Sequence, residues 1–236
     1  MSKGILYVAH GKRYLKEVAI SAESVKKHSP SLEITLFTDE EVEVPFVDKV
    51  VVIKAKTLRA KVYCMYDSPY DNTCFLDSDV VVDYPIDEMF DIFPKYDMGG
   101  VHDLARKRDK YSNLMPEYGE IPYSVSEINT GMLLFRKCDQ VKDLFEMWKK
   151  YHTKYYKGCP YDQPSFRISM WKSDVNFCSL PVEYNIRSKQ NREKQVRFHD
   201  EFGKDHLTPR MYHMHYDGNK TLESALQFMK ENHQPY

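Results

Sequence analysis

The sequence predicts an α/β protein built on a mostly parallel sheet that is flanked by helices. Short apolar runs alternate with segments whose apolar residues recur at helical spacing, which is the pattern of successive βαβ units. The chain has 236 residues, of which 42% are hydrophobic, and a chain of this size can bury a sizeable core. We find no repeat, low-complexity tract or linker in the sequence. We therefore expect one domain over residues 1–236.

Three strands and one helix are expected in the first third of the chain. Residues 5–9 form an apolar run, and residues 14–28 carry apolar side chains at helical spacing until Pro30. Residues 32–38 and 50–53 have the pattern of a second and a third strand. This arrangement is typical of a nucleotide-binding half-domain.

The remainder of the chain continues the alternation. Residues 103–112 are charged throughout, so we expect a mobile loop there. Few apolar residues follow Pro181 before Met211, which predicts loops. The other expected elements are helices at residues 58–66, 141–151 and 221–231 and strands at residues 73–76, 97–101 and 127–136.

Composition excludes several classes of protein. The 34 basic and 35 acidic residues nearly cancel, so no long-range field would gather nucleic acid or anionic lipid, and we expect neither partner. No apolar window is long enough to span a membrane, and the first residues lack a signal-peptide layout. The five cysteines are odd in number and include no CxxC pair, which argues against a disulfide framework or a zinc ribbon. We expect a reduced, cytoplasmic protein.

An acidic pair, Asp77 and Asp79, directly follows the strand expected at residues 73–76. Ligands of open α/β sheets bind at the carboxyl ends of the strands. Where the chain turns, two carboxylates one residue apart can both reach one divalent cation, and such oxygen ligands suit Mg²⁺ or Mn²⁺. A solvated Asp-x-Asp turn is the alternative. The apolar flanks disfavour it, because two buried like charges are costly without a cation.

Residues 75–82 (FLDSDVVV) resemble the metal-binding DxD strand of the GT-A glycosyltransferases, and the chain is similar to their glycogenin and galactosyltransferase group, the family 8-like enzymes. The resemblance implies a Rossmann-like GT-A fold. It also implies an enzyme that transfers a sugar from a nucleotide diphosphate donor, favouring a UDP-sugar, to a hydroxyl acceptor with retained configuration. The cofactor would be Mn²⁺ or Mg²⁺, which clamps the diphosphate. Residues 1–82 would bind the nucleotide, and residues 83–236 would bind the acceptor and close over the metal.

The same resemblance assigns donor-binding residues to the first half of the chain. A basic residue before the DxD strand contacts the donor phosphates or sugar in this family, which implies Lys61 or Arg59; either could instead merely solvate its helix. Strand ends hold the base or ribose, although an ordinary turn also explains their polar residues. The implied donor-binding residues are Ala9, His10, Thr38, Asp39, Arg59, Lys61, Asp77 and Ser78.

Two further motifs resemble catalytic segments of the family. Residues 129–135 (NTGMLLF) look like its NTG strand, in which Asn129 would face the sugar or acceptor. Asp162 and Gln163 look like its DQ motif, whose Asp holds donor-sugar hydroxyls and whose Gln lies beneath the anomeric carbon. The structural alternatives are a tight strand entry for the first motif and a helix N-cap at Asp162 for the second. Tyr161 and three preceding tyrosines, Tyr151, Tyr155 and Tyr156, predict at least one exposed ring at the cleft.

The segment from His213 to Lys220 looks like the family's HxxG motif. His215 has the correct spacing to Gly218, so the resemblance implies Asp77, Asp79 and His215 as metal ligands, with His213 as a core residue. Gly218 and Lys220 would then contact the diphosphate. Lys220 lies one residue closer to the glycine than in the family, which leaves its role open.

Two alternatives from other classes remain. Residues 77–81 (DSDVV) also match the nucleophile motif of haloacid-dehalogenase phosphatases, although that motif stands near the start of its domain. A degenerate transferase that binds nucleotide or carbohydrate without turnover is the other alternative.

Overall fold

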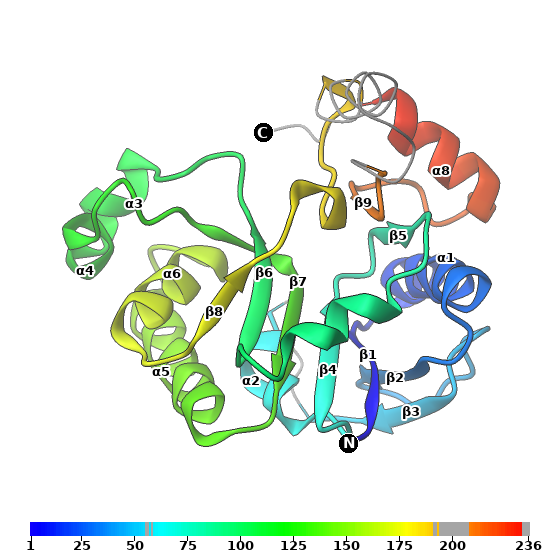
Figure 1. Ribbon diagram of the computed structural model, residues 1–236, viewed down its shortest axis with the longest axis horizontal. Coiled ribbons are helices and arrows are strands. Elements are labelled where there is room, and N and C mark those ends of the chain that lie inside the picture. Colours follow the sequence, from blue (N-terminus) through cyan, green and yellow to red (C-terminus); the bar gives the residue numbers. More distant parts are fainter. Residues whose placement is uncertain (55–56, 58, 191–192, 194–207, 233–236) are drawn as a thin grey trace.

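The computed structural model describes the chain except for residues 55–56, 58, 191–192, 194–207 and 233–236. Its main element is a seven-stranded sheet with the strand order β3-β2-β1-β4-β7-β6-β8 (Figure 1). The strands are β1 (Lys3–Val8), β2 (Glu33–Thr38), β3 (Lys49–Val52), β4 (Asn72–Leu76), β6 (Met98–His102), β7 (Ile128–Arg136) and β8 (Phe177–Ser179).

One strand of this sheet runs against the others. β1 is parallel to β2 and β4, β2 is parallel to β3, and β6 is parallel to β8, whereas β7 is antiparallel to both β4 and β6. The amino end of β7 therefore lies at the same edge as the carboxyl ends of β4 and β6. The sheet is mixed and mostly parallel, as the sequence predicts.

Helices cover both faces of the sheet (Figure 1). Along β1, Ile5 packs with the apolar residues of α1 (Lys12–His28) on one face. Leu6 points to the other face and packs in a second core cluster, which contains Trp148. That cluster is completed by α2 (Lys61–Cys64), α5 (Asp139–Tyr155) and α6 (Gln163–Lys172). This alternation explains why the strands are apolar on both faces.

A second, two-stranded sheet brings the end of the chain to the DxD turn. β5 (Val80–Val82) pairs antiparallel with β9 (Met211–His213), and the register sets Val80 opposite His213. The Met214 amide continues the contact by donating to the Asp79 carbonyl oxygen at 3.2 Å. The last helix, α8 (Leu222–Glu231), packs behind β9 (Figure 1). His213 and His215 thus lie beside Asp79.

The prediction of a loop over residues 103–112 is wrong in part. Residues 109–114 form α3 (Asp109–Leu114), which is followed by α4 (Pro116–Glu120). Tyr111 anchors this charged segment to the protein, because its buried ring packs edge-on against Tyr118 at 5.7 Å between ring centroids. Lys107 adds two hydrogen bonds from Nζ to backbone carbonyls, both at 2.7 Å.

The other expected elements are found with shifted ends. The expected helix at residues 58–66 is shorter and becomes a 3-10 helix, η1 (Met65–Asp67), after α2. Short 3-10 helices also occur at η2 (Asp87–Ile92) and, within the segment expected as loops, at η3 (Val182–Tyr184). Much of that segment lies outside the described residues. All five cysteines are free thiols. Within the described ranges, no helix has the length and apolar character needed to cross a membrane.

We expect Gly4→Ala to destabilise the fold. A Cβ atom at Gly4 would lie 2.6 Å from two ring carbons of Tyr70, and forced overpacking costs about 1–3 kcal/mol. At Gly158 the nearest atom to an added Cβ is 3.9 Å away, so Gly158→Ala should change the free energy of unfolding by no more than about 0.5 kcal/mol. Urea denaturation measures both, and equal stability of the two variants would contradict the packing of Tyr70 on β1.

Candidate functional site

The acidic turn lies at the edge of the sheet where β4 ends and the antiparallel strand β7 begins. Residues 77–79 follow β4, and the Asp77 amide donates to the Gly131 carbonyl oxygen at 2.7 Å. Asn129, at the amino end of the reversed strand β7, therefore lies next to the carboxyl end of β4. Ser78 is tied to α1, because its hydroxyl donates a hydrogen bond to Oε2 of Glu17 on that helix at 2.8 Å.

Lys61 joins the acidic turn to the start of α6. Its Nζ atom lies 2.9 Å from Asp77 Oδ1 and 3.1 Å from Asp162 Oδ2, and it also donates to the Thr130 carbonyl oxygen at 3.0 Å. Arg59 approaches the other oxygen of Asp162 at 3.5 Å. Asp162 stands at the N-cap position of α6, as the alternative expects, but its side chain makes no capping hydrogen bond. Its carboxylate instead pairs with Lys61 and Arg59.

Charge pairing sets the ionisation of this cluster. Burial opposes the charged form of Asp162, but the cations Lys61 and Arg59 and the Thr130 hydroxyl hold the pKa of its carboxyl below the ordinary value. Burial likewise lowers the pKa of Lys61, yet the charges of Asp162 and Asp77 outweigh it and raise the pKa above the usual value. Both groups therefore carry their charges at neutral pH.

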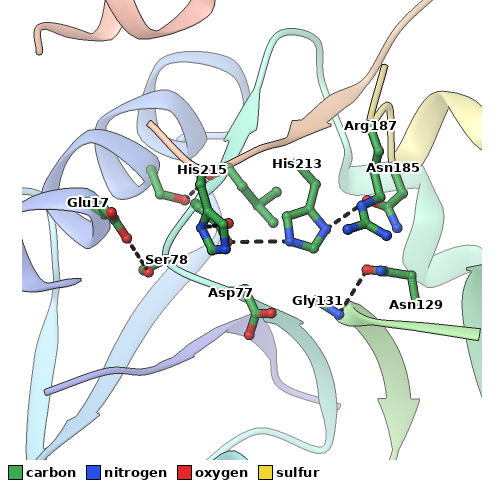
Figure 2. A network of polar contacts seen from close by, with 12 residues as sticks. Glu17, Asp77, Ser78, Asn129, Gly131, Asn185, Arg187, His213 and His215 are labelled. Atoms are coloured by element: carbon green, nitrogen blue, oxygen red, sulfur yellow. Dashed lines mark hydrogen bonds and ion pairs between the residues drawn. The ribbon is translucent and has the colours of Figure 1, made fainter. Parts of the chain in front are cut away.

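Two histidines face Asp79. His213 Nε2 lies 3.4 Å from Asp79 Oδ1, and His215 Nδ1 lies 2.6 Å from Oδ2. Figure 2 shows both histidines together with Asp77 and Ser78. Asp77, Asp79 and His213 bring one ligand atom each to within 4.8 Å of one another, a spacing that could hold one metal ion. The description of His213 as only a core residue is therefore incomplete. The side chain of His215 is 60% exposed, on the open side of Asp79.

Asn185 and Gly131 fix the orientation of His213. The Asn185 Oδ1 atom lies 3.0 Å from His213 Nδ1. This contact turns the other ring nitrogen, Nε2, toward Asp79. A Cβ atom at residue 131 would lie 2.8 Å from both ring nitrogens. The NTG motif thus needs its glycine, because a larger residue would clash with this imidazole. The alternative of a tight strand entry did not include this reason.

The predicted catalytic residues meet on the other side of the cleft. Asn129 Nδ2 lies 3.4 Å from Gln163 Oε1 and 3.3 Å from Asp103 Oδ2. Glu127, which is fully buried, accepts a hydrogen bond from Gln163 Nε2. The sequence analysis missed Asp103 and Glu127. Their signal is position, since one directly follows β6 and the other directly precedes β7.

One cavity of about 190 Å³ gathers most of the predicted donor-binding residues, including Ala9, Arg59 and Ser78. Its neighbour, a cleft of about 330 Å³, contains Asn129 and Gln163. Three polar atoms at the ends of β1 and β2 are buried and have no hydrogen-bond partner within the described part of the chain; they are His10 Nδ1, Thr38 Oγ1 and Asp39 Oδ1. His10 lines the first cavity, whereas Thr38 and Asp39 do not.

Lys220 lies beside a hollow that adjoins the first cavity. Gly218 also lines this hollow, which shares His215 with the first cavity. Lys220 Nζ lies over the Phe228 ring at 5.0 Å from its centroid. Tyr161 is 49% exposed and lines the cleft with Gln163, which confirms the prediction of an exposed tyrosine there.

No protein-family model and no curated protein sequence matches the chain, but solved glycosyltransferases match its fold. The galactosyltransferase LgtC, solved in complex with donor and acceptor sugar analogues, aligns at 16% identity and a TM-score of 0.59 over 99% of this chain and 97% of that one. The glycosyltransferase GlyE of Streptococcus pneumoniae TIGR4 aligns at 14% identity and 0.64, over 97% and 60% of the two chains. Mouse xyloside xylosyltransferase 1 aligns at 14% and 0.57, over 90% and 97%. The chain therefore has the GT-A glycosyltransferase fold that its motifs predict.

Proposed function

We propose that the chain is a metal-dependent glycosyltransferase. It would move a sugar, of the hexose type by resemblance, from a nucleotide diphosphate donor to a hydroxyl acceptor with retained anomeric configuration, and UDP is the favoured nucleotide. The observation that carries the proposal is the meeting of the DxD turn, the NTG strand, the DQ motif and the histidine segment around adjoining cavities. These segments are far apart in the sequence, so an ordinary turn or cap does not account for their convergence.

The residues at the acidic turn suit a divalent cation. Asp77 and Asp79 would supply carboxylate oxygens, and His215 and His213 would supply imidazole nitrogens, a mixed set that Mn²⁺ accepts more readily than Mg²⁺. Burial disfavours the charge of Asp79, but the two histidines hold the pKa of its carboxyl well below the usual range, so the ligand is anionic before any metal binds. A metal held by these residues would neutralise the donor diphosphate and would supply Lewis-acid assistance to the departing nucleotide.

The protein side chains would position the sugar nucleotide. The buried atoms at His10, Thr38 and Asp39 offer hydrogen bonds to a base or ribose, which would satisfy groups that are otherwise costly to bury. Lys61 and Arg59 form the cationic wall between the two cavities. Asp162, held ionised by that wall, would accept hydrogen bonds from donor-sugar hydroxyls, and Gln163 and Asn129 would lie against the reacting carbon.

The two alternatives differ in measurable ways. In the phosphatase alternative Asp77 attacks phosphorus, but this carboxylate is engaged by Lys61 at 2.9 Å and follows β4 rather than the first strand. A nucleotide-binding protein without turnover would share the fold and the metal ligands. Release of UDP from a sugar nucleotide separates it from an enzyme.

We expect UDP and Mn²⁺ to stabilise the protein together far more than either alone. A ligand at 100 times its Kd adds about 2.7 kcal/mol to the free energy of unfolding. A thermal-shift panel of UDP, GDP and ADP with and without MnCl₂ measures this stabilisation and identifies the base. Equal shifts with and without Mn²⁺ would contradict the metal-bridged donor site.

Asp79→Asn should abolish the Mn²⁺-dependent part of UDP binding while leaving the protein folded. The substitution removes an anionic ligand but keeps the shape of the side chain. Asp83→Asn is the matched control, because Asp83 lies just beyond β5 and pairs with Lys230 at 2.7 Å, away from the turn. Titration calorimetry of UDP at saturating MnCl₂ makes the comparison, and wild-type affinity in Asp79→Asn would remove this carboxylate from the metal site.

His215→Ala and His213→Ala should each lower Mn²⁺ affinity in the presence of UDP by about 10- to 100-fold. Imidazole must be neutral to bind metal, and the hydrogen bond to Asp79 raises the pKa of His215, so affinity should fall as the pH drops through that raised value. His28→Ala serves as the control. A loss in only one variant identifies a single histidine ligand, and no loss in either excludes this segment from the metal site.

A further inference from the structure

Glu127 is a buried carboxylate beside the predicted catalytic amide. The residue is fully buried, directly before β7, and both of its oxygens are occupied. Oε1 accepts a hydrogen bond from the Tyr118 hydroxyl, and Oε2 accepts one from Gln163 Nε2. Burying a carboxylate that has no role would lower the stability of the protein, because desolvation disfavours its charge.

The direction of these hydrogen bonds follows from their partners. The Tyr118 hydroxyl already accepts the Arg108 amide hydrogen at 2.9 Å, so its own proton is free to point at Glu127. Burial raises the pKa of Glu127, whereas the hydrogen bonds from Tyr118 and Gln163 act against that rise. In this arrangement Glu127 accepts at both oxygens, and Gln163 turns its NH₂ group toward Oε2.

The opposite side of the cleft fixes the second amide in the same way. Asn129 Nδ2 donates to Asp103 Oδ2 at 3.3 Å, and Asn129 Oδ1 accepts the Gly131 amide hydrogen at 3.0 Å. Asp103 is itself buried and pairs with Arg187 at 2.6 Å. The Asn129 NH₂ group therefore also faces Gln163 Oε1, at 3.4 Å. Two carboxylates at the ends of this chain of hydrogen bonds thus determine how both amides point.

We propose that Glu127 is a positioning residue that turns the side-chain oxygen of Gln163, rather than its NH₂ group, toward the substrate. This inference rests on the proposed function. In the transfer, the bond from the anomeric carbon to the diphosphate oxygen breaks and its electron pair leaves with the nucleotide. The acceptor oxygen forms the new bond and gives its proton to the departing diphosphate. Positive charge develops on the anomeric carbon, where an amide oxygen stabilises it and an NH₂ group would oppose it.

Glu127→Gln tests the proposal, because an amide at this position can donate as well as accept and frees Gln163 to rotate. With UDP-galactose and UDP-glucose as donors and MnCl₂ present, we expect kcat for UDP release to fall about 10- to 100-fold and the donor KM to change by no more than about twofold. Glu127→Asp, which withdraws the carboxylate from Gln163, should show the same loss. A KM effect without a kcat effect would overturn the proposal.

Glu88→Gln is the matched control. Glu88 accepts the Tyr184 hydroxyl as Glu127 accepts that of Tyr118, but it lies on η2, outside the cleft that holds Gln163. This variant should keep wild-type kcat, and an equal loss there would show that removing any such carboxylate disturbs the protein.

A double-substitution cycle separates positioning from a general structural role. In the Gln163→Ala background, Glu127→Gln should cause no further loss of kcat, because the amide that Glu127 positions has been removed. If the losses of kcat from the two substitutions multiply instead, the proposal is overturned.

An activity-independent measurement keeps this inference separate from the proposed function. The side-chain ¹⁵NH₂ resonances of Gln163 should show one strongly hydrogen-bonded proton in the wild type and lose that signature in Glu127→Gln. Unchanged resonances would contradict the positioning role whatever the activity. If the wild type releases no UDP from either donor while the resonances shift as expected, the proposed function fails and the contact between Glu127 and Gln163 stands.

Discussion

The cleft depends on the buried ion pairs of Lys61. The residue is 5% exposed, and an ammonium group at such a position is tolerated only when it is paired and hydrogen-bonded. Asp77 after β4, Asp162 at the start of α6 and the Thr130 carbonyl of β7 all contact its Nζ atom. One cation therefore holds three segments in register. The same pairing keeps Asp162 ionised, which is the state that sugar hydroxyls require.

Strand direction decides which residues can reach this cation. Because β7 is antiparallel to β4 and β6, its first residues lie at the edge where those strands end. A parallel β7 would place Asn129 and Gly131 at the far edge of the sheet. The pairing of β9 with β5 completes the arrangement, since it sets His213 opposite Val80, next to Asp79. Gly131 then leaves the space that this imidazole fills, so the NTG strand and the histidine segment are complementary in shape.

The sequence allowed the acidic turn and the strands of the large sheet other than β8 to be predicted, because their signals are local. Runs such as residues 73–76 are apolar without interruption, and the carboxylates stand directly after them. The partners of Asp162 were not predictable from residue patterns, because Lys61 reaches it only through the folded sheet. Placing His213 beside Asp79 required the register of β9, and recognising α3 required the contact of Tyr111 with Tyr118. The resemblance left the role of Lys220 open, and its Nζ atom lies over the Phe228 ring.

Turnover of a sugar nucleotide by the wild-type protein tests the central claim most directly. Purified protein is incubated with UDP-galactose or UDP-glucose, in MnCl₂ or in EDTA, and the released UDP and the anomer of the free sugar are quantified. The account predicts UDP release that requires the metal, with the sugar released in its original anomeric configuration. Metal-dependent binding of UDP with no release from either donor would contradict the enzymatic claim, and hydrolysis of p-nitrophenyl phosphate in its place would indicate a phosphatase.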